Sequence, residues 1–149
     1  DELTFLMAHD RDGFNRWEAG QMLATRLALT LVEDWRAGRP LVLEPAFIDA
    51  VARQLDSAEA DPAFAALALT LPSESQLGQP MAEIAVDGLH AVHAFMRRTL
   101  GERLRRGWLE CWRACRRERS FAVDGLAIGR RYARRAGQPV PPGQAEPEI

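Results

Sequence analysis

The chain has 149 residues, 47% of them hydrophobic and 27% charged, with a formal net charge of −2, so one domain burying about 70% of its unfolded surface is expected. No apolar run approaches the roughly 18 residues of a membrane span, and no basic-then-apolar signal peptide stands at the amino terminus. These features exclude a membrane-spanning protein and predict a soluble one with no membrane partner.

A long helix is predicted from Asp12 to Gly38, because Asp12 suits an N-cap and Gly38 suits a helix stop. A buried stripe at helical spacing follows from these residues: Trp17, Ala24, Leu27, Ala28, Leu31 and Trp35. Upstream, Leu3 to Met7 is the one stretch that we interpret as a short strand. Residues 1–11 would then lie outside the helical domain.

Two shorter helices and a turn are predicted next. The first begins at Pro45, a residue suited to a first helical turn, and buries Phe47, Ile48, Val51 and Leu55. The second, DPAFAALALTL at 61–71, has Asp61 as its cap and Pro62 at its first position, with Phe64, Leu67 and Leu71 on one side. The segment SESQLGQP is expected to form a turn or a short helical piece that ends at Pro80.

The longest helical pattern runs from Asp87 to Arg116 and predicts two helices, or one helix bent at Gly101 or Gly107. One face carries Met96, Leu100, Leu104, Cys111 and Cys115, and the opposite face carries Arg98, Arg105 and Arg116. A last helix is predicted at 124–137, with Leu126, Ile128 and Tyr132 in the core. The proline-rich residues 138–149 predict a disordered tail. The fold class is therefore all-α, with the helical domain at 12–137.

Four residues are potential zinc ligands. His90 and His93 form an H-x-x-H pair, and Cys111 and Cys115 form a C-x-x-x-C pair. The spacing matches no standard zinc signature, and we interpret the histidines as hydrogen-bonded core residues. A bridge between cysteines four apart on one helix is awkward, so we expect thiols in a reducing compartment, the cytoplasm.

No catalytic residue is predicted in this chain. Asp10, Asp12, Glu18 and Glu33 could supply carboxylate pairs, but caps and solvated helix faces explain them better. Nothing selects a cysteine, a histidine and an orienting group for one cleft. The patterns G-x-G-x-x-G, G-x-x-x-x-G-K and G-x-S-x-G are absent.

Charge is unevenly distributed along the chain. Residues 1–96 carry 15 acidic residues and 6 arginines, whereas residues 97–135 carry 13 arginines and 4 acidic residues. A basic segment can neutralise phosphates, so an independent interaction module that binds nucleic acid through 97–135 is the alternative function. Adjacent arginines point about 100° apart on a helix, however, which favours a solvated or acid-paired face.

Three stretches resemble aminopeptidase N of the bacterial alanyl aminopeptidase type. They are FLMAHDRDGFNRWEAGQMLA at 5–24, DPAFAALALTLPSE at 61–74 and DGLHAVHAFMRRTLGERLRRGWLECWRA at 87–114, in fitting order and spacing. The most specific parts are FNRWEAGQ and ALTLPSE. The resemblance covers residues 1–135.

This resemblance implies a zinc-dependent enzyme that removes amino-terminal residues from peptides, built from a β-saddle, a thermolysin-like catalytic domain, a small β-domain and a large helical domain. The chain matches the junction, with residues 1–11 as the end of the β-domain or a linker, and the first part of the helical domain. As part of an α-solenoid-like array, that domain caps the catalytic cavity. The remainder of the polypeptide and peptide substrates are the implied partners.

The family's catalytic motifs do not occur here. The zinc motif H-E-x-x-H and the G-A-M-E-N motif that anchors the free amine are both absent. No catalytic, cofactor-binding or metal residue therefore carries over, and the implied zinc belongs to a catalytic domain that this chain does not include. An isolated piece of a larger helical domain should also expose apolar surface, so we expect a homodimer or a sticky monomer.

Overall fold

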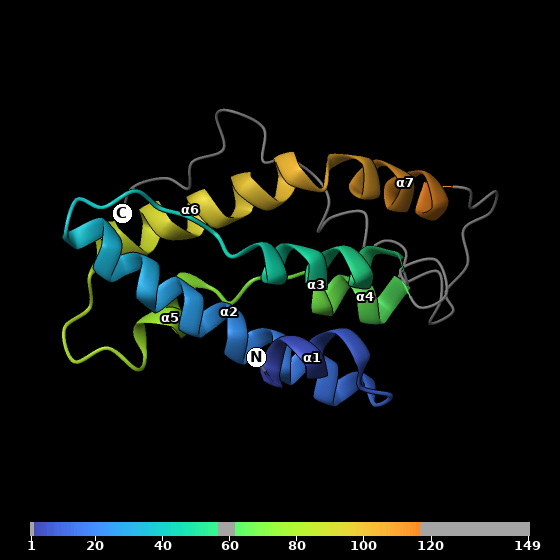
Figure 1. Cartoon of the computed structure of the whole chain (residues 1–149), viewed down its shortest axis with the longest axis horizontal. Coiled ribbons are helices and arrows are strands. Elements are labelled where there is room, and N and C mark those ends of the chain that lie inside the picture. Colours follow the sequence, from blue (N-terminus) through green and yellow to red (C-terminus); the bar gives the residue numbers. More distant parts are fainter. Residues whose placement is uncertain (1, 57–61, 117–149) are drawn as a thin grey trace.

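The structure, a computed structural model, describes residues 2–56 and 62–116. These residues form seven helices (Figure 1): α1 Glu2–His9, α2 Gly13–Arg36, α3 Pro45–Asp56, α4 Pro62–Ala68, α5 Glu74–Gly78, α6 Val86–Arg103 and α7 Arg105–Arg116. No strand occurs within the described ranges, and the all-α prediction is confirmed. The predicted helix at 124–137, the tail at 138–149 and the cap Asp61 lie outside the described residues.

The predicted strand at Leu3 to Met7 is wrong, because this segment belongs to helix α1. Leu3, Leu6 and Met7 follow the i, i+3, i+4 spacing of a helix, and Met7 is buried while the other two pack against the same core. Packing of α1 along α2 buries this face. The assignment of residues 1–11 to a preceding domain or linker stays a prediction.

Both ends of α2 are where the sequence predicted them. The Asp12 carboxylate accepts hydrogen bonds from the backbone N–H groups of Phe14 and Asn15, at 2.8 and 3.2 Å. Gly38 has a φ of 67°, the left-handed conformation that ends helices and that glycine adopts without strain. The predicted buried stripe holds except at its ends: Trp17 is half-buried and Trp35 is 41% exposed. Trp35 lies in the last turn, where α2 runs past the core.

Helix α3 begins at Pro45 and buries all four predicted apolar residues. Helix α4 is shorter than predicted and ends at Ala68. Its buried residues are Ala65 and Ala66. Of the predicted face, Phe64 and Leu71 are half-buried, but Leu67 is exposed, so the prediction is wrong for Leu67. Ala65 and Ala66 face the small cluster with Leu55 and Cys111, and Leu67 lies on another side of the short helix.

Residues 87–116 form two helices, which is one of the two alternatives that the sequence predicted. They lie nearly in line (Figure 1), but the break falls at Leu104 and not at either glycine. Leu104 has φ −107° and ψ 17°, and its half-buried side chain packs against both apolar clusters of the protein. Tertiary packing therefore decides where the helix breaks.

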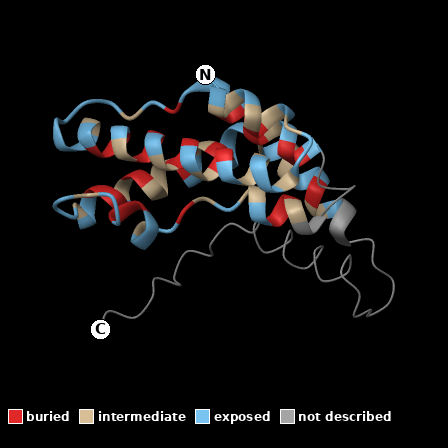
Figure 2. Ribbon diagram, turned by 90° about the horizontal axis from the view of Figure 1, so that it is seen from below, coloured by how far each residue is buried: buried red, intermediate tan, exposed pale blue. Residues whose placement is uncertain are grey.

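Buried residues lie along the sides of the helices that face other helices, as the colours of Figure 2 show. The main cluster joins α1, α2, α3, α5 and α6, and a second, smaller cluster of Leu55, Ala65, Ala66 and Cys111 lies between α3, α4 and α7. Among the described residues, no helix is long and apolar enough to cross a membrane.

Candidate functional site

Two histidines and one glutamate meet where α5 packs on α6. The Glu74 Oε1 atom lies 3.1 Å from His90 Nδ1 and 3.8 Å from His93 Nδ1. His90 and His93 are three residues apart, so they project from neighbouring positions on one side of α6. The His90 side chain is 75% exposed, so its assignment as a core histidine is wrong, whereas the His93 side chain is 19% exposed.

Glu74 is the member of this cluster that the sequence analysis did not select. It occupies the first position of α5, which begins with a capping box. The Ser73 hydroxyl accepts from the Gln76 backbone N–H, and the Gln76 side-chain oxygen accepts from the Ser73 backbone N–H at 2.8 Å. The S-x-x-Q pattern of the sequence could have located this helix start. The contact of Glu74 with α6 depends on tertiary packing and leaves no local signal.

Burial lowers the pKa of His93 below its ordinary value of 6.5. The Glu74 carboxylate and a backbone hydrogen bond with Pro72 act in the opposite direction, whereas Arg97 and His90 add to the lowering. A neutral His93 is therefore favoured in the folded state, and this histidine packs at the edge of the core as a largely uncharged ring.

The four potential zinc ligands of the sequence are not brought together within the described residues. The two histidines lie beside Glu74 at α5, whereas Cys111 is buried in the small cluster against α3 and α4. The surroundings of Cys115 lie outside the described residues. No group of three or more His, Cys, Asp or Glu side chains suited to a metal ion occurs in the described ranges. His90, His93 and Cys111 therefore do not form a zinc site with one another.

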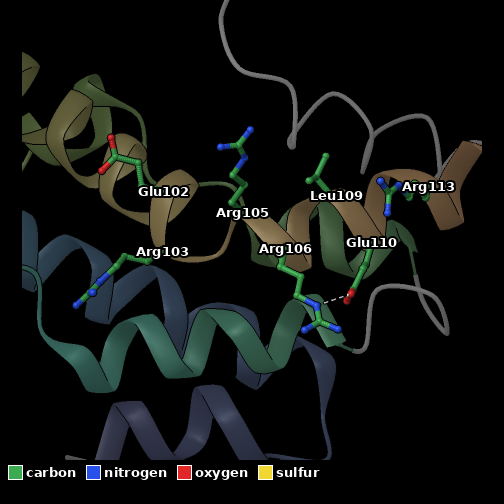
Figure 3. Close-up of a pocket in the computed structure, with 7 residues that line it drawn as sticks. All are labelled: Glu102, Arg103, Arg105, Arg106, Leu109, Glu110 and Arg113. Atoms are coloured by element: carbon green, nitrogen blue, oxygen red, sulfur yellow. Dashed lines mark hydrogen bonds and ion pairs between the residues drawn. The ribbon is translucent and has the colours of Figure 1, made fainter.

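Arginines and two glutamates line a shallow hollow around the junction of α6 and α7 (Figure 3). The lining residues are Glu102, Arg103, Arg105, Arg106, Leu109, Glu110 and Arg113. Arg106 Nε donates to Glu110 Oε1 at 2.9 Å, an i, i+4 ion pair on the helix surface. Opposite this hollow, Trp108 is half-buried against the small cluster. Trp108 thus packs against the core and not into the hollow.

The chain matches the family described as "Domain of unknown function (DUF3458_C) ARM repeats" over residues 1–136. The chain belongs to this ARM-repeat family. The described helices bury their apolar faces against one another, in keeping with the stacking of helices in such arrays.

Known relatives of this ARM-repeat domain are aminopeptidases. The chain is 40% identical over 138 residues to aminopeptidase N of Caulobacter vibrioides, covering 88% of this chain and 15% of the relative. It is 34% identical over 136 residues to aminopeptidase N of Escherichia coli, covering 91% of this chain and 15% of the relative. The chain thus spans about 15% of the length of these curated relatives and is similar to their C-terminal helical region.

A solved structure shares the fold. Legionella pneumophila aminopeptidase A, in complex with aspartic acid, matches 91% of this chain with a TM-score of 0.75 and 20% identity. The match covers 16% of that protein's chain. The seven-helix arrangement is therefore one that an aminopeptidase contains as a small part of a much longer polypeptide.

Proposed function

We propose that this chain is a non-catalytic helical part of a zinc-dependent aminopeptidase and that it contributes to the cap over the catalytic cavity. The observation that carries the proposal is the similarity to aminopeptidase N, 40% identity that extends over 138 residues. The sequence lacks H-E-x-x-H, which favours a non-catalytic role, because a catalytic zinc needs three protein ligands and an open position.

A cap of this kind acts through shape and rigidity. The main cluster fixes α1, α2, α3, α5 and α6 relative to one another, so the helices present a stable outer surface. Excluding folded protein from a catalytic cavity needs such a surface and no reactive group on it. Peptides are the proposed substrates of the whole enzyme, and the rest of its polypeptide is the proposed partner.

Zinc content and peptidase activity of the purified, tag-free chain test the non-catalytic part of the proposal. We expect less than one zinc per chain and no hydrolysis of an alanine aminoacyl reporter above the buffer rate. One zinc per chain together with turnover would contradict the proposal. The metal measurement covers the whole chain, including the residues outside the described ranges.

A chimeric enzyme tests whether this chain can function as part of an aminopeptidase. This chain replaces the matching 138-residue segment of the Caulobacter vibrioides aminopeptidase N, and the chimera is compared with the same enzyme lacking that segment. We expect the chimera to retain zinc and alanine-reporter turnover, whereas the deleted enzyme loses turnover. A folded, zinc-loaded chimera without activity would argue against the proposal.

Isolated chain should self-associate, because large apolar side chains remain exposed. They are Phe5, Phe14, Met22, Trp35, Val42, Leu67, Ile84, Val86 and Leu109. A longer polypeptide would cover part of this surface. We infer a homodimer or a sticky monomer, to be measured by sedimentation velocity over a concentration series with a dye that binds apolar surface. A monomer without dye binding at high concentration would contradict this inference.

We also infer a cytoplasmic location, which the two cysteines support. Cys111 is buried in the small cluster and packs there as a small apolar residue. Titration of thiols after denaturation without reductant should find two per chain.

A further inference from the structure

A stripe of three residues on α7 combines charge with an apolar centre. Arg105, Leu109 and Arg113 are spaced four residues apart, so they share one face of the helix. All three line the hollow of Figure 3, where the Arg105 and Leu109 side chains leave the helix on the side away from α3. The two arginines stand about 12 Å apart along the helix axis, given a rise of about 1.5 Å per residue. Leu109, between them, is 44% exposed.

The two arginines of this stripe have no ion-pair partner among the described residues. Arg106 pairs with Glu110, but within the described ranges neither Arg105 nor Arg113 forms an ion pair. Two arginines that flank an exposed leucine therefore offer two anion contacts and one apolar contact on a single line.

We propose that this α7 stripe, Arg105, Leu109 and Arg113, is a docking surface for an acidic amphipathic helix of a neighbouring part of the same, longer polypeptide. The partner helix carries carboxylates at positions i and i+8 and an apolar residue at i+4. This spacing reads the same in both directions, so it suits parallel and antiparallel partners. The same-polypeptide origin rests on the proposed function, because an ARM-repeat array stacks helix on helix.

Charge and chemistry select this partner over the alternatives. The last helix predicted in this chain, at 124–137, carries four arginines and one acid, so like charges argue against it. A nucleic-acid backbone would place its phosphates over Leu109 as well as over the two arginines. An exposed leucine at the centre also adds nothing to phosphate binding, whereas it anchors a helix with an apolar residue.

Equilibrium disulfide trapping makes a weak helix contact measurable. The full chain carrying Leu109→Cys and Cys115→Ser is mixed, in a glutathione buffer, with helical peptides that contain one cysteine. One peptide has glutamates four residues before and after its cysteine, and a second has lysines there. We expect the glutamate peptide to form the mixed disulfide about tenfold more favourably, because two modest ion pairs multiply their effects. Arg105→Glu/Arg113→Glu in the same background should reverse this preference.

Position and class of ligand are tested by three controls. A peptide with its glutamates two residues from the cysteine has the same charge on the wrong face, and it should lose most of the advantage. The exposed α2 position, in Met22→Cys/Cys115→Ser, should not prefer the glutamate peptide. Equal trapping of the two glutamate peptides at the α7 stripe would overturn the proposal. So would salt-sensitive binding of a single-stranded oligothymidine that Arg105→Glu/Arg113→Glu abolishes, because the ligand would then be nucleic acid.

The source of the partner is tested in the Caulobacter chimera. Arg105→Glu/Arg113→Glu should lower the Tm of the chimera by about 3 °C or more and leave the Tm of the isolated chain unchanged. The matched charge change Arg11→Glu/Arg98→Glu, outside the hollow, should leave the chimera within about 1 °C. An unchanged Tm in the chimera would overturn the same-polypeptide origin. Loss of activity in the unmodified chimera would count against the proposed function alone, and the trapping ratio would still decide the docking surface.

Discussion

The two apolar clusters of this protein differ in size and in what they hold. The main cluster contains 18 buried residues and joins five helices, whereas the cluster under α7 contains four, two of them alanines. Helix α7 is therefore held by few apolar contacts and presents mostly arginines on its other side. Among the described residues, most of the buried apolar side chains therefore belong to the main cluster of α1, α2, α3, α5 and α6, and few of them hold α7.

The largest effect is expected from truncation in the main cluster. Leu23 is 0% exposed, so Leu23→Ala should lower the free energy of unfolding by about 3 kcal/mol or more, through lost burial and a residual cavity. Its neighbour Met22 is 55% exposed, and Met22→Ala should change stability by less than about 0.5 kcal/mol. Urea unfolding of both variants checks this contrast. Similar losses would show that α2 is not packed with this face inward.

A smaller and more local effect is expected in the cluster under α7. Leu55→Ala should cost about 2 kcal/mol, because Leu55 packs against the α7 backbone at Gly107, where an added Cβ would lie 3.3 Å from Leu55 Cδ1. Hydrogen exchange should accelerate in α7 before it does so in α2. Val51→Ala, on the same helix but in the main cluster, is the control, and it should accelerate exchange in both helices. Uniform acceleration by Leu55→Ala would mean that the two clusters unfold as one.

Two glycines lie on different sides of α6: Gly88 faces α2, and Gly101 faces solvent. A Cβ at Gly88 would lie 3.0 Å from Trp35 Cε3, so Gly88→Ala should destabilise the protein by about 1 kcal/mol. A Cβ at Gly101 meets nothing within 4 Å, so Gly101→Ala should stabilise the helix by about 0.5 kcal/mol. Thermal unfolding gives both signs, and stabilisation by Gly88→Ala would show that α2 and α6 are less closely packed.

The smallest effect concerns His93, at the edge of the main cluster. Because burial lowers its pKa below 6.5, the unfolded chain binds a proton at this residue more readily than the folded chain. The stability that this residue contributes is present above pH 6.5 and is lost as the pH falls through the lowered pKa of the folded state. His93→Gln should remove that part of the loss between pH 7.5 and 5.5, measured by urea unfolding, with His90→Gln as the control. An unaltered pH dependence in His93→Gln would contradict the burial argument.

Local features of the fold were predictable from the sequence, and features that depend on distant contacts were not. The caps at Asp12 and Gly38 follow from backbone hydrogen bonding and conformational freedom within a few residues. The helix break at Leu104 and the exposure of Leu67 depend on which neighbours pack nearby, and the five-residue stretch at Leu3 was too short to distinguish a strand from a helix.

The same division applies to the candidate site. The resemblance to aminopeptidase N came from FNRWEAGQ and ALTLPSE, and the family match over residues 1–136 confirms it. The meeting of Glu74 with two histidines joins residues that are 16 or more positions apart in sequence, and no local pattern indicates it. The sequence shows that α7 is rich in arginine. Only the structure shows that, within the described residues, Arg106 forms an ion pair whereas Arg105 and Arg113 do not.

The proposed cap role is tested most directly by comparing substrates in the Caulobacter chimera. The kcat/KM for a dipeptide reporter is measured against that for the exposed amino terminus of a folded protein, in the chimera and in the parent enzyme. We predict that the chimera keeps both the dipeptide turnover and the parent's preference for the dipeptide, because this chain restores the barrier at the cavity entrance. A chimera that turns over the dipeptide but accepts the folded protein equally well would show that the chain does not cap the cavity.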